Sequence, residues 1–195
     1  MVASTPIYRG KILNLDLETV TLPNGATVEL EIIHHPGASA VVPLREDGQV
    51  LLIRQYRHAA GGYIYEIPAG KLAPGEEPRD CALRELEEEI GVRAGVLTPL
   101  LSILTTPGFT DETIHLFVAR DLKPGRQHLD PDEVLEVAAV PLAEALAWIE
   151  RGVIRDGKTI VALQAVSLAS QKAESGSRDV GGVGKGGDQR GGVTP

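Results

Sequence analysis

Residues Gly70 to Val92 read GKLAPGEEPRDCALRELEEEIGV, and this stretch predicts a loop that leads into a helix. Pro78 suits the first turn of the helix, where its missing N–H group costs nothing. Gly91 suits the C-terminal cap, which takes a left-handed backbone conformation. Apolar residues recur at every fourth position from Ala82 to Ile90, so one helix face can pack against a sheet while another stays free.

The face that stays free is acidic. Glu85, Glu88 and Glu89 are spaced i, i+3 and i+4, so their carboxylates can converge on one side of the helix. Converging carboxylates repel one another unless a cation lies among them, and Mg²⁺ or Mn²⁺ prefers such oxygen ligands. The alternative is an acidic helix face that is simply solvated, as we expect for the neighbouring Glu87.

The same stretch resembles the Nudix hydrolase signature at every fixed position. That signature is a glycine, five residues, a glutamate, seven residues, and then the run R-E-U-x-E-E-x-G-U, in which U is aliphatic. Here Gly70, Glu76 and the run Arg84 to Val92 follow one another at the required spacing. A solvated acidic helix explains neither the glycines nor the spacing. The resemblance implies hydrolysis of a diphosphate bond on an α/β fold, an α-β-α sandwich of Nudix type with a mixed sheet.

Size and composition narrow the class of protein. The chain has 195 residues, of which 43% are hydrophobic, and this is enough for one cored domain with an appendage. A net charge of −8 offers no electrostatic footprint for nucleic acid or an anionic membrane. The single cysteine, Cys81, excludes an internal disulfide and suits a reducing cytosol. We find no N-terminal leader and no apolar run of membrane-spanning length, so we expect a cytoplasmic protein.

Three segments are expected along the chain. Residues 1–36 predict a small antiparallel β element, with strands at 12–22 and 26–34 around a Pro-Asn-Gly turn. Such a hairpin is marginal alone and must pack on another surface. Residues 37–173 predict the Nudix domain, and its last helix is expected to end near Lys172. Residues 174–195 are rich in glycine and charge and predict a disordered tail.

The resemblance also implies roles for individual residues. Mg²⁺, or Mn²⁺ in its place, would be held by Glu85, Glu88 and Glu89 together with the backbone carbonyl of Ala69. Arg84 is expected to pair with Glu76 or another glutamate and so to orient the ligands; direct substrate contact is the alternative.

A general base is expected from the loop at residues 128–136. Glu133 is the first candidate, followed by Asp132 and Asp130. The alternative is that these acidic residues before a strand are solvated and take no part in the reaction.

Other segments resemble the ADP-ribose pyrophosphatase branch of the family. They are RQYR at 54–57, EIPAGK at 66–71, PGFTDE at 107–112 and IRDGKT at 154–159. This branch cleaves ADP-ribose to AMP and ribose 5-phosphate and forms homodimers through its N-terminal strands. The resemblance implies that Arg57 binds phosphate, with Arg54 and Glu112 as further substrate contacts.

Two alternatives stay open. One is a diphosphatase for another nucleoside diphosphate sugar, such as GDP-mannose. The other is a non-catalytic ADP-ribose-binding sensor, although such a sensor usually lacks signature carboxylates that this chain retains.

Overall fold

The computed structural model describes residues 3–129 and 134–179. Ten strands, three helices and one short 3₁₀ helix are described in this part of the chain. The strands are β1 (Ala3–Arg9), β2 (Asn14–Thr21), β3 (Thr27–His34), β4 (Ala38–Pro43), β5 (Gln49–Arg57), β6 (Gly62–Glu66), β7 (Ala69–Lys71), β8 (Val92–Leu104), β9 (Thr113–Pro124) and β10 (Leu135–Pro141). The helices are η1 (His58–Ala60), α1 (Pro78–Ile90), α2 (Leu142–Glu150) and α3 (Gly157–Asp179).

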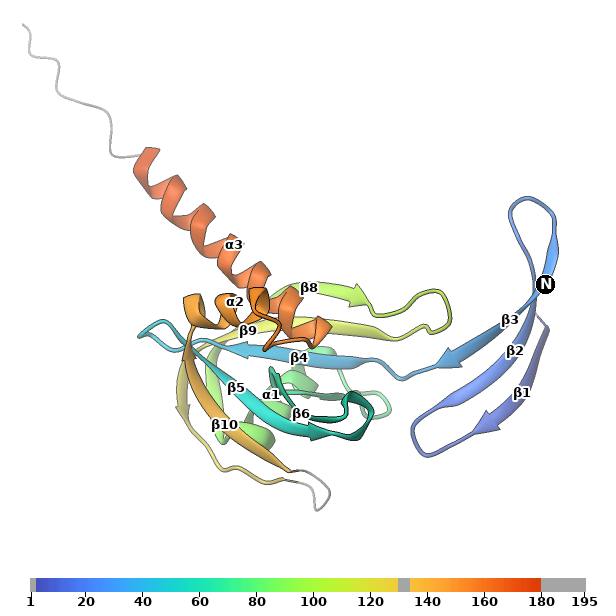
Figure 1. Cartoon of the computed structure of the whole chain (residues 1–195), viewed down its shortest axis with the longest axis horizontal. Coiled ribbons are helices and arrows are strands. Elements are labelled where there is room, and N and C mark those ends of the chain that lie inside the picture. The colour runs from blue at the N-terminus through green and yellow to red at the C-terminus, as the bar shows by residue number, and fades with distance from the viewer. Residues whose placement is uncertain (1–2, 130–133, 180–195) are drawn as a thin grey trace, which may run out of the picture.

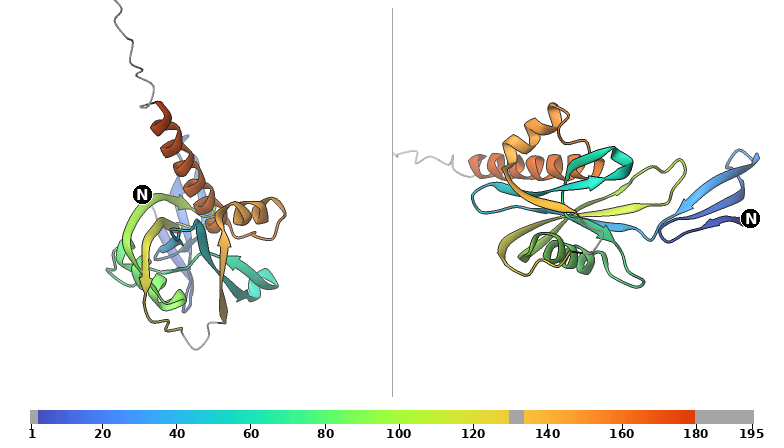
Figure 2. Two further views of the ribbon diagram at one scale, coloured as in Figure 1. Left: turned by 90° about the vertical axis from the view of Figure 1, so that its left-hand side faces the viewer. Right: turned by 60° about the horizontal axis from the view of Figure 1, so that its bottom comes forward.

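Two sheets form the middle of the main domain, with strand orders β10-β5-β6 and β7-β4-β9-β8. Strands β4 and β9 are parallel, whereas the other pairs in these sheets are antiparallel, so the second sheet is mixed. Helix α1 covers one side of these strands, and α2 and α3 cover the other (Figures 1 and 2). The expected α-β-α sandwich of Nudix type with a mixed sheet is therefore confirmed.

Strand β4 is buried along its whole length because both of its faces are covered. On β4, Val41 packs with α1, whereas Ala40 and Val42 pack with α2 and α3. The neighbouring strands alternate in the same way: Ile53 faces α1 and Leu52 faces the other helices. The period of two along each strand thus divides the core into two clusters, one on each side of the sheets.

Helix α1 has the limits that the sequence predicts. Pro78 is its first residue, and Gly91 caps its C-terminus with φ 67°, donating its N–H to the Glu87 carbonyl oxygen at 2.9 Å. The apolar face of the helix is buried, with Ala82 and Leu86 fully enclosed. This packing fixes the rotation of the helix and therefore the direction in which its acidic face points.

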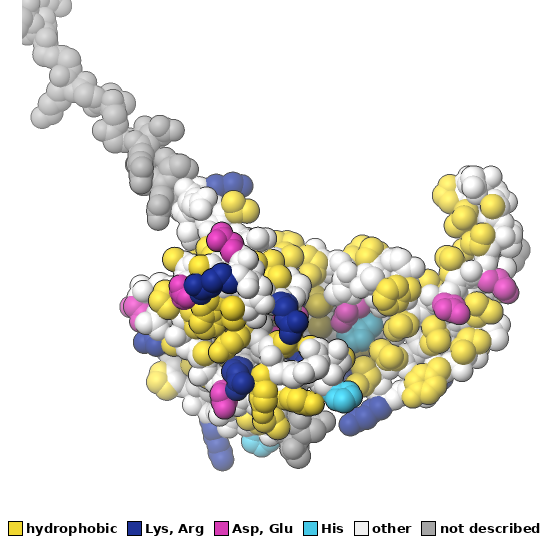
Figure 3. Space-filling view, in the orientation of Figure 1, with side chains coloured by type: hydrophobic (Ala, Val, Ile, Leu, Met, Phe, Trp, Pro, Cys, Tyr) yellow, Lys and Arg dark blue, Asp and Glu magenta, His cyan; other side chains and the backbone are white. Residues whose placement is uncertain are grey.

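The N-terminal element is a three-stranded antiparallel sheet that extends away from the main domain (Figure 1). The sequence predicts two of its strands and misses β1, whose pairing with β2 shifts register between Pro6 and Tyr8. Pro6 has no N–H to donate, and the strand lacks a clean apolar-polar alternation. Hydrophobic side chains lie open on this sheet (Figure 3), among them Ile7 and Tyr8 at 57% and 58% exposed.

Helix α3 runs to Asp179, past residue 174, where the sequence predicts that the tail begins. Extending a helix costs much less than starting one, so α3 continues into residues of low helix propensity. Residues 180–195 lie outside the described part of the chain. None of the described helices is both long enough and apolar enough to span a membrane.

Candidate active site

The loop and the helix of the signature meet at Gly70 and Glu85. Gly70 lies in β7, which is paired with β4, and α1 packs beside both strands. A Cβ atom at Gly70 would overlap the Glu85 carboxylate as it lies here, so any other residue would force that side chain to move. The spacing between the two residues in the signature therefore reflects a direct contact across the loop.

Arg84 links three carboxylates of the signature. Its Nε and Nη2 donate to the two Glu76 oxygens at 2.8 and 3.0 Å, and its Nη1 donates to Glu85 at 2.5 Å and to Glu88 at 3.0 Å. The expected pairing of Arg84 with Glu76 is present. The hydrogen bonds from Arg84 lower the pKa of Glu76 to about 2, and Glu76 in turn raises the pKa of Arg84.

Glu89 lies deeper than the other signature glutamates and is 2% exposed. Its Oε2 accepts a hydrogen bond from the Ala69 N–H at 2.9 Å. Since α1 and β7 are joined here, the Ala69 backbone lies against the acidic face of the helix. This is the residue whose carbonyl the family resemblance assigns to a metal.

A cavity of about 540 Å³ opens over this acidic face. Five of the predicted site residues line it: Ala69, Glu85, Glu88, Arg57 and Glu112. It is also lined by Ile12, His35, Ala38, Gly70, Lys71, Arg84, Ile114, His128 and Lys158. The structure thus gathers residues from the N-terminal element, β5, β7, α1, the loop before β9 and α3 around one space.

The two arginines that the sequence predicts as substrate contacts point away from each other, and only one of them reaches the cavity. Arg57 lines the cavity and donates to Glu66 through Nε and Nη2. Arg54 does not line it: its guanidinium lies 4.2 Å from the centre of the Tyr63 ring and 3.4 Å from Glu136. Successive residues of a strand point to opposite faces, and the odd spacing between 54 and 57 sends these two side chains apart.

Glu112 reaches the cavity from the loop before β9. It accepts a hydrogen bond from the Thr105 hydroxyl at 2.8 Å and lies 3.4 Å from His35 Nδ1. His35 begins the segment that joins the N-terminal sheet to β4. The position of Glu112 therefore depends on the junction between the two parts of the molecule.

The predicted general bases, Glu133, Asp132 and Asp130, lie outside the described residues. The described start of their loop is attached to α1. His128 donates its N–H to the Glu88 carbonyl at 2.9 Å, and the Gln127 side chain donates to the Glu89 carbonyl at 2.7 Å. These two bonds hold the described start of the loop against the C-terminal half of α1.

Sequence reasoning missed Lys158 and His128 as residues that line the cavity. Lys158 lies in the segment IRDGKT, which the sequence singles out without giving the lysine a role. Because Lys158 is far along the chain from the signature, no sequence pattern indicates that both line the same cavity.

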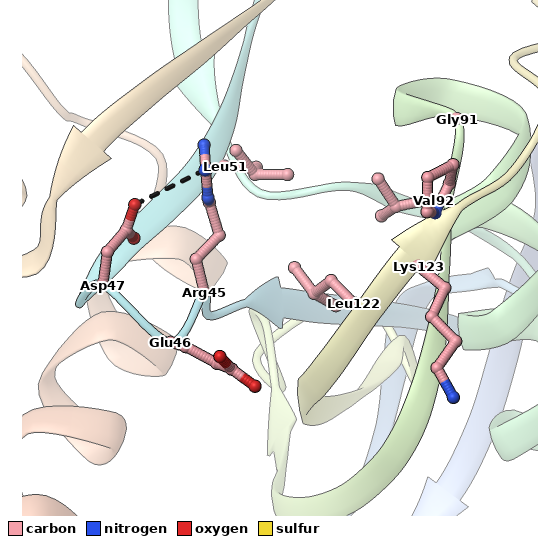
Figure 4. Close-up of a pocket in the computed structure, with 9 residues that line it drawn as sticks. Arg45, Glu46, Asp47, Leu51, Gly91, Val92, Leu122 and Lys123 are labelled. Carbon is pink, nitrogen blue, oxygen red and sulfur yellow. Dashed lines mark ion pairs between the residues drawn. The ribbon is translucent and has the colours of Figure 1, made fainter.

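A second hollow of about 650 Å³ lies at the other end of α1, and Figure 4 shows its lining. Its acidic residues, Glu46 and Asp47, lie on the turn between β4 and β5, and Asp47 pairs with Arg45. Leu51, Val92 and Leu122 form an apolar wall. Because the signature carboxylates do not reach this hollow, the smaller cavity is the candidate active site.

The acidic face offers hard oxygen donors, which suit a divalent cation. Glu85 and Glu89 are buried carboxylates, and Glu88 lies at the open cavity beside them. As placed, Arg84 stands between Glu85 and Glu88, and among the described residues no three acidic, histidine or cysteine side chains converge into a ready metal site. A cation bound by Glu85 and Glu88 would therefore compete with Arg84 for their oxygens.

Comparison with known proteins gives consistent matches. Residues 33–163 match the NUDIX domain. The chain is 43% identical over 169 residues to the ADP-ribose pyrophosphatase of Bacillus subtilis, covering 86% of this chain and 91% of that protein. It is 37% identical over 141 residues to the GDP-mannose pyrophosphatase of Cronobacter sakazakii, covering 68% and 73%. A crystal structure of an ADP compounds hydrolase superposes with a TM-score of 0.77 at 25% identity, covering 88% of this chain and 93% of the other.

The pair formed by Glu76 and Arg84 predicts a specific dependence of stability on pH. Arg84 lowers the pKa of Glu76 from 4.5 to about 2 in the folded protein. A carboxyl group with a lowered pKa stabilises the fold above its unfolded pKa, and this contribution is lost as the pH falls towards the folded pKa. We expect Glu76→Gln to be less stable than the wild type near neutral pH, with a difference that shrinks below the unfolded pKa of 4.5.

Urea unfolding of both proteins at about pH 7, 4 and 3 measures this difference, and the linear extrapolation gives each free energy. A difference that stays constant or grows as the pH falls would contradict the ion pair.

Proposed function

The chain belongs to the NUDIX domain family, and on that premise we propose that it hydrolyses the diphosphate bond of ADP-ribose to AMP and ribose 5-phosphate. The observation that carries the proposal is a cavity that gathers two of the signature glutamates, Glu85 and Glu88, with Arg57 and Glu112. Glu89 does not line this cavity but is buried beside it, where it accepts the Ala69 N–H. One wall of the cavity is acidic and another is cationic, an arrangement suited to a diphosphate bound together with cations. The similarity to an ADP-ribose pyrophosphatase over most of both chains supports this substrate.

We propose Mg²⁺ as the cofactor, with Mn²⁺ as a substitute, held by Glu85, Glu88, Glu89 and the Ala69 carbonyl. When bound, such an ion neutralises the diphosphate oxygens and makes water a better nucleophile. The chain's own residues prepare this site. Gly70 leaves room for the Glu85 carboxylate, the Ala69 N–H holds Glu89, and the paired Glu76 anchors Arg84 beside the ligands.

The other residues of the cavity act on the substrate and the water. Arg57 is proposed to bind a phosphate, because a guanidinium presents several N–H donors in a fixed plane. Glu112 is proposed as a polar contact to the substrate from the opposite loop. Glu133 remains our candidate general base, because its loop starts at His128 on the cavity wall.

A homodimer is proposed from the N-terminal sheet. This sheet carries exposed apolar side chains, and a small sheet without a core of its own is marginal in water. A second copy would cover these apolar side chains.

We also propose a cytoplasmic enzyme, since the one cysteine of the chain, Cys81, is a free thiol and suits a reducing compartment.

GDP-mannose is the second candidate substrate, favoured by the similarity to a GDP-mannose pyrophosphatase. The diphosphate chemistry of the two substrates is the same, and only the base and the sugar differ. A non-catalytic ADP-ribose sensor is a weaker alternative, because the chain retains the complete acidic face.

The acidic face can be tested with two glutamates of the same helix. Glu89→Gln removes a buried carboxylate of the proposed metal site, and we expect kcat for ADP-ribose to fall by about 100-fold or more, the range for lost electrostatic stabilisation. Glu87→Gln is the matched control, since Glu87 pairs with Arg93, whereas Glu89 accepts the N–H of Ala69, the residue whose carbonyl is proposed as a metal ligand. We expect its kcat to stay within about twofold of the wild type, because exposed ion pairs contribute little.

Steady-state kinetics with circular dichroism as a check on folding measures both variants. Equal activity of Glu89→Gln and Glu87→Gln would remove Glu89 from the site.

A substrate panel tests the function itself. We expect the protein with Mg²⁺ to release AMP from ADP-ribose faster than products from GDP-mannose, ADP-glucose or deoxynucleoside triphosphates, as resolved by chromatography. A chelator such as EDTA should abolish turnover, and excess Mg²⁺ or Mn²⁺ should restore it, because the carboxylate donors bind these ions reversibly. A preference for GDP-mannose would replace the substrate but keep the chemistry, whereas binding of ADP-ribose without any turnover would identify a sensor.

The oligomeric state has its own test. Analytical ultracentrifugation at micromolar concentration should give the mass of two chains, near twice 20.7 kDa. Ile7→Asp places a charge on the exposed apolar face of the N-terminal sheet and should shift the protein towards monomer. A wild-type monomer over this range would contradict the dimer.

A further inference from the structure

The N-terminal sheet is joined to the main domain through the loop between β8 and β9, which carries Glu112. The Ile33 N–H donates to the Phe109 carbonyl oxygen at 2.8 Å, and the Asp111 N–H donates to the Ile33 carbonyl oxygen at 3.3 Å. Strand β3 is at the edge of its sheet, so these bonds pair that edge with the loop. The loop therefore contacts the N-terminal sheet just before it reaches the cavity with Glu112.

Asp111 is the side chain that fastens this junction. Its Oδ1 accepts the His35 N–H at 2.8 Å, and its Oδ2 lies 2.6 Å from His34 Nδ1. His35 and Glu112 line the active-site cavity, whereas Asp111 and His34 do not. Asp111 thus holds the backbone of one cavity residue and immediately precedes the other in the chain.

His34, the last residue of β3, has a carboxylate at each of its two ring nitrogens. Its Nδ1 faces Asp111 of the loop, and its Nε2 lies 3.2 Å from Glu18 Oε1 on β2. Asp16, also on β2, approaches Nε2 to 3.9 Å, but Asp16 forms its own ion pair with Arg9 at the end of β1. In the described part of the chain, the ring therefore bridges the N-terminal sheet and the loop.

Both nitrogens of His34 have to donate in this geometry. An ionised carboxylate only accepts hydrogen bonds, and a neutral imidazole carries a single N–H. A neutral His34 would therefore turn a lone pair towards either Asp111 or Glu18, whereas the protonated ring donates to both. The hydrogen bond with Asp111 raises the pKa of His34 above its ordinary value of 6.5, and the Glu18 carboxylate adds to this effect.

We propose that His34 is a positioning residue whose positive charge fastens the N-terminal sheet to Asp111. Through Asp111, this contact holds His35 and Glu112 in place on the cavity wall. The inference rests on the proposed function, since it concerns how the N-terminal sheet affects the substrate contacts of the same cavity.

The proposal fixes the direction of the pH dependence. A histidine with a raised pKa stabilises the bonded arrangement below its unfolded pKa, and this contribution is lost as the pH rises through the folded pKa. Deprotonation of His34 leaves one carboxylate without a donor, so the loop is held less firmly and the substrate binds less tightly.

The first test follows the His34 ring by NMR in the full chain without substrate. Its titration should give a pKa above 6.5, and Asp111→Asn and Glu18→Gln should each lower that pKa, because each removes a charged acceptor. Protection of the Ile33 and Asp111 amides against hydrogen exchange should fall as the wild type passes through this pKa. It should not fall in His34→Arg, whose charge does not titrate.

The second test measures KM for ADP-ribose from about pH 6 to about pH 9, the range in which histidine titrates. At the acidic end, His34→Gln should raise KM by about threefold, the size expected for a partly exposed charged pair. Its kcat should stay within about twofold of the wild type, because the contact does not involve the reacting atoms. With rising pH the wild-type KM should approach that of His34→Gln, whereas His34→Arg should keep the lower KM throughout.

His58→Gln is the matched control, because His58 lies in η1 and does not line the cavity. Its KM should follow the wild type at every pH. The pair formed by His35 and Glu112 is unchanged in all these proteins, so the ratio of each variant's KM to the wild-type KM isolates the effect of His34.

Equal KM values for the wild type, His34→Gln and His34→Arg across this range would overturn the proposal, even if His34→Gln had a lower melting temperature. A His34 pKa at or below 6.5, or amide protection that does not change with it, would also overturn it. If His34→Gln fails to fold, the wild type and His34→Arg decide. If the wild type does not hydrolyse ADP-ribose, the proposed function is wrong, and the NMR titration still decides whether His34 fastens the loop.

Discussion

The site depends on placing carboxylates where water is scarce. Glu85 and Glu89 are 8% and 2% exposed on a helix packed against a sheet. An ionised carboxylate loses several kcal/mol of hydration free energy on burial unless charges or hydrogen bonds replace the water. Here Arg84 and the Ala69 N–H supply that replacement. Gly70 leaves the space that the Glu85 carboxylate occupies, and β7 brings the Ala69 N–H to Glu89.

The two sheets provide the rigid support that holds these buried carboxylates in place. Because the central strands alternate between two apolar clusters, α1 is fixed on one side and α3 on the other. Helix α1 then carries the acidic wall, and the start of α3 brings Lys158 to the same cavity. Carboxylates of α1 and the two cations Arg57 and Lys158 thus line one cavity, which supports the proposed binding of a diphosphate together with metal ions. Electrostatic stabilisation by such fixed groups is generally the largest part of catalysis on charged substrates.

Sequence patterns predict those features of the molecule that depend on residues close together in the chain. The limits of α1 follow from Pro78 and Gly91, and the pairing of Arg84 with Glu76 follows from the signature. The sequence could not place Lys158, because its partner Glu66 is 92 residues away and no periodicity links them. It also missed β1, a strand defined by pairing with β2 rather than by its own pattern. Arg54 is a further example. Its odd spacing from Arg57 implies that the two side chains lie on opposite faces of the strand, but the sequence does not say which face borders the cavity.

The central claim is that Glu85, Glu88 and Glu89 hold a divalent cation. Anomalous diffraction from crystals of the full chain soaked with Mn²⁺ tests it most directly, because the signal locates the ion without reference to activity. The account predicts a peak within about 2.0–2.4 Å of these carboxylates, near the Ala69 carbonyl, with Arg84 withdrawn from Glu85 and Glu88. No peak there in a protein that hydrolyses ADP-ribose in the same Mn²⁺ buffer would contradict it.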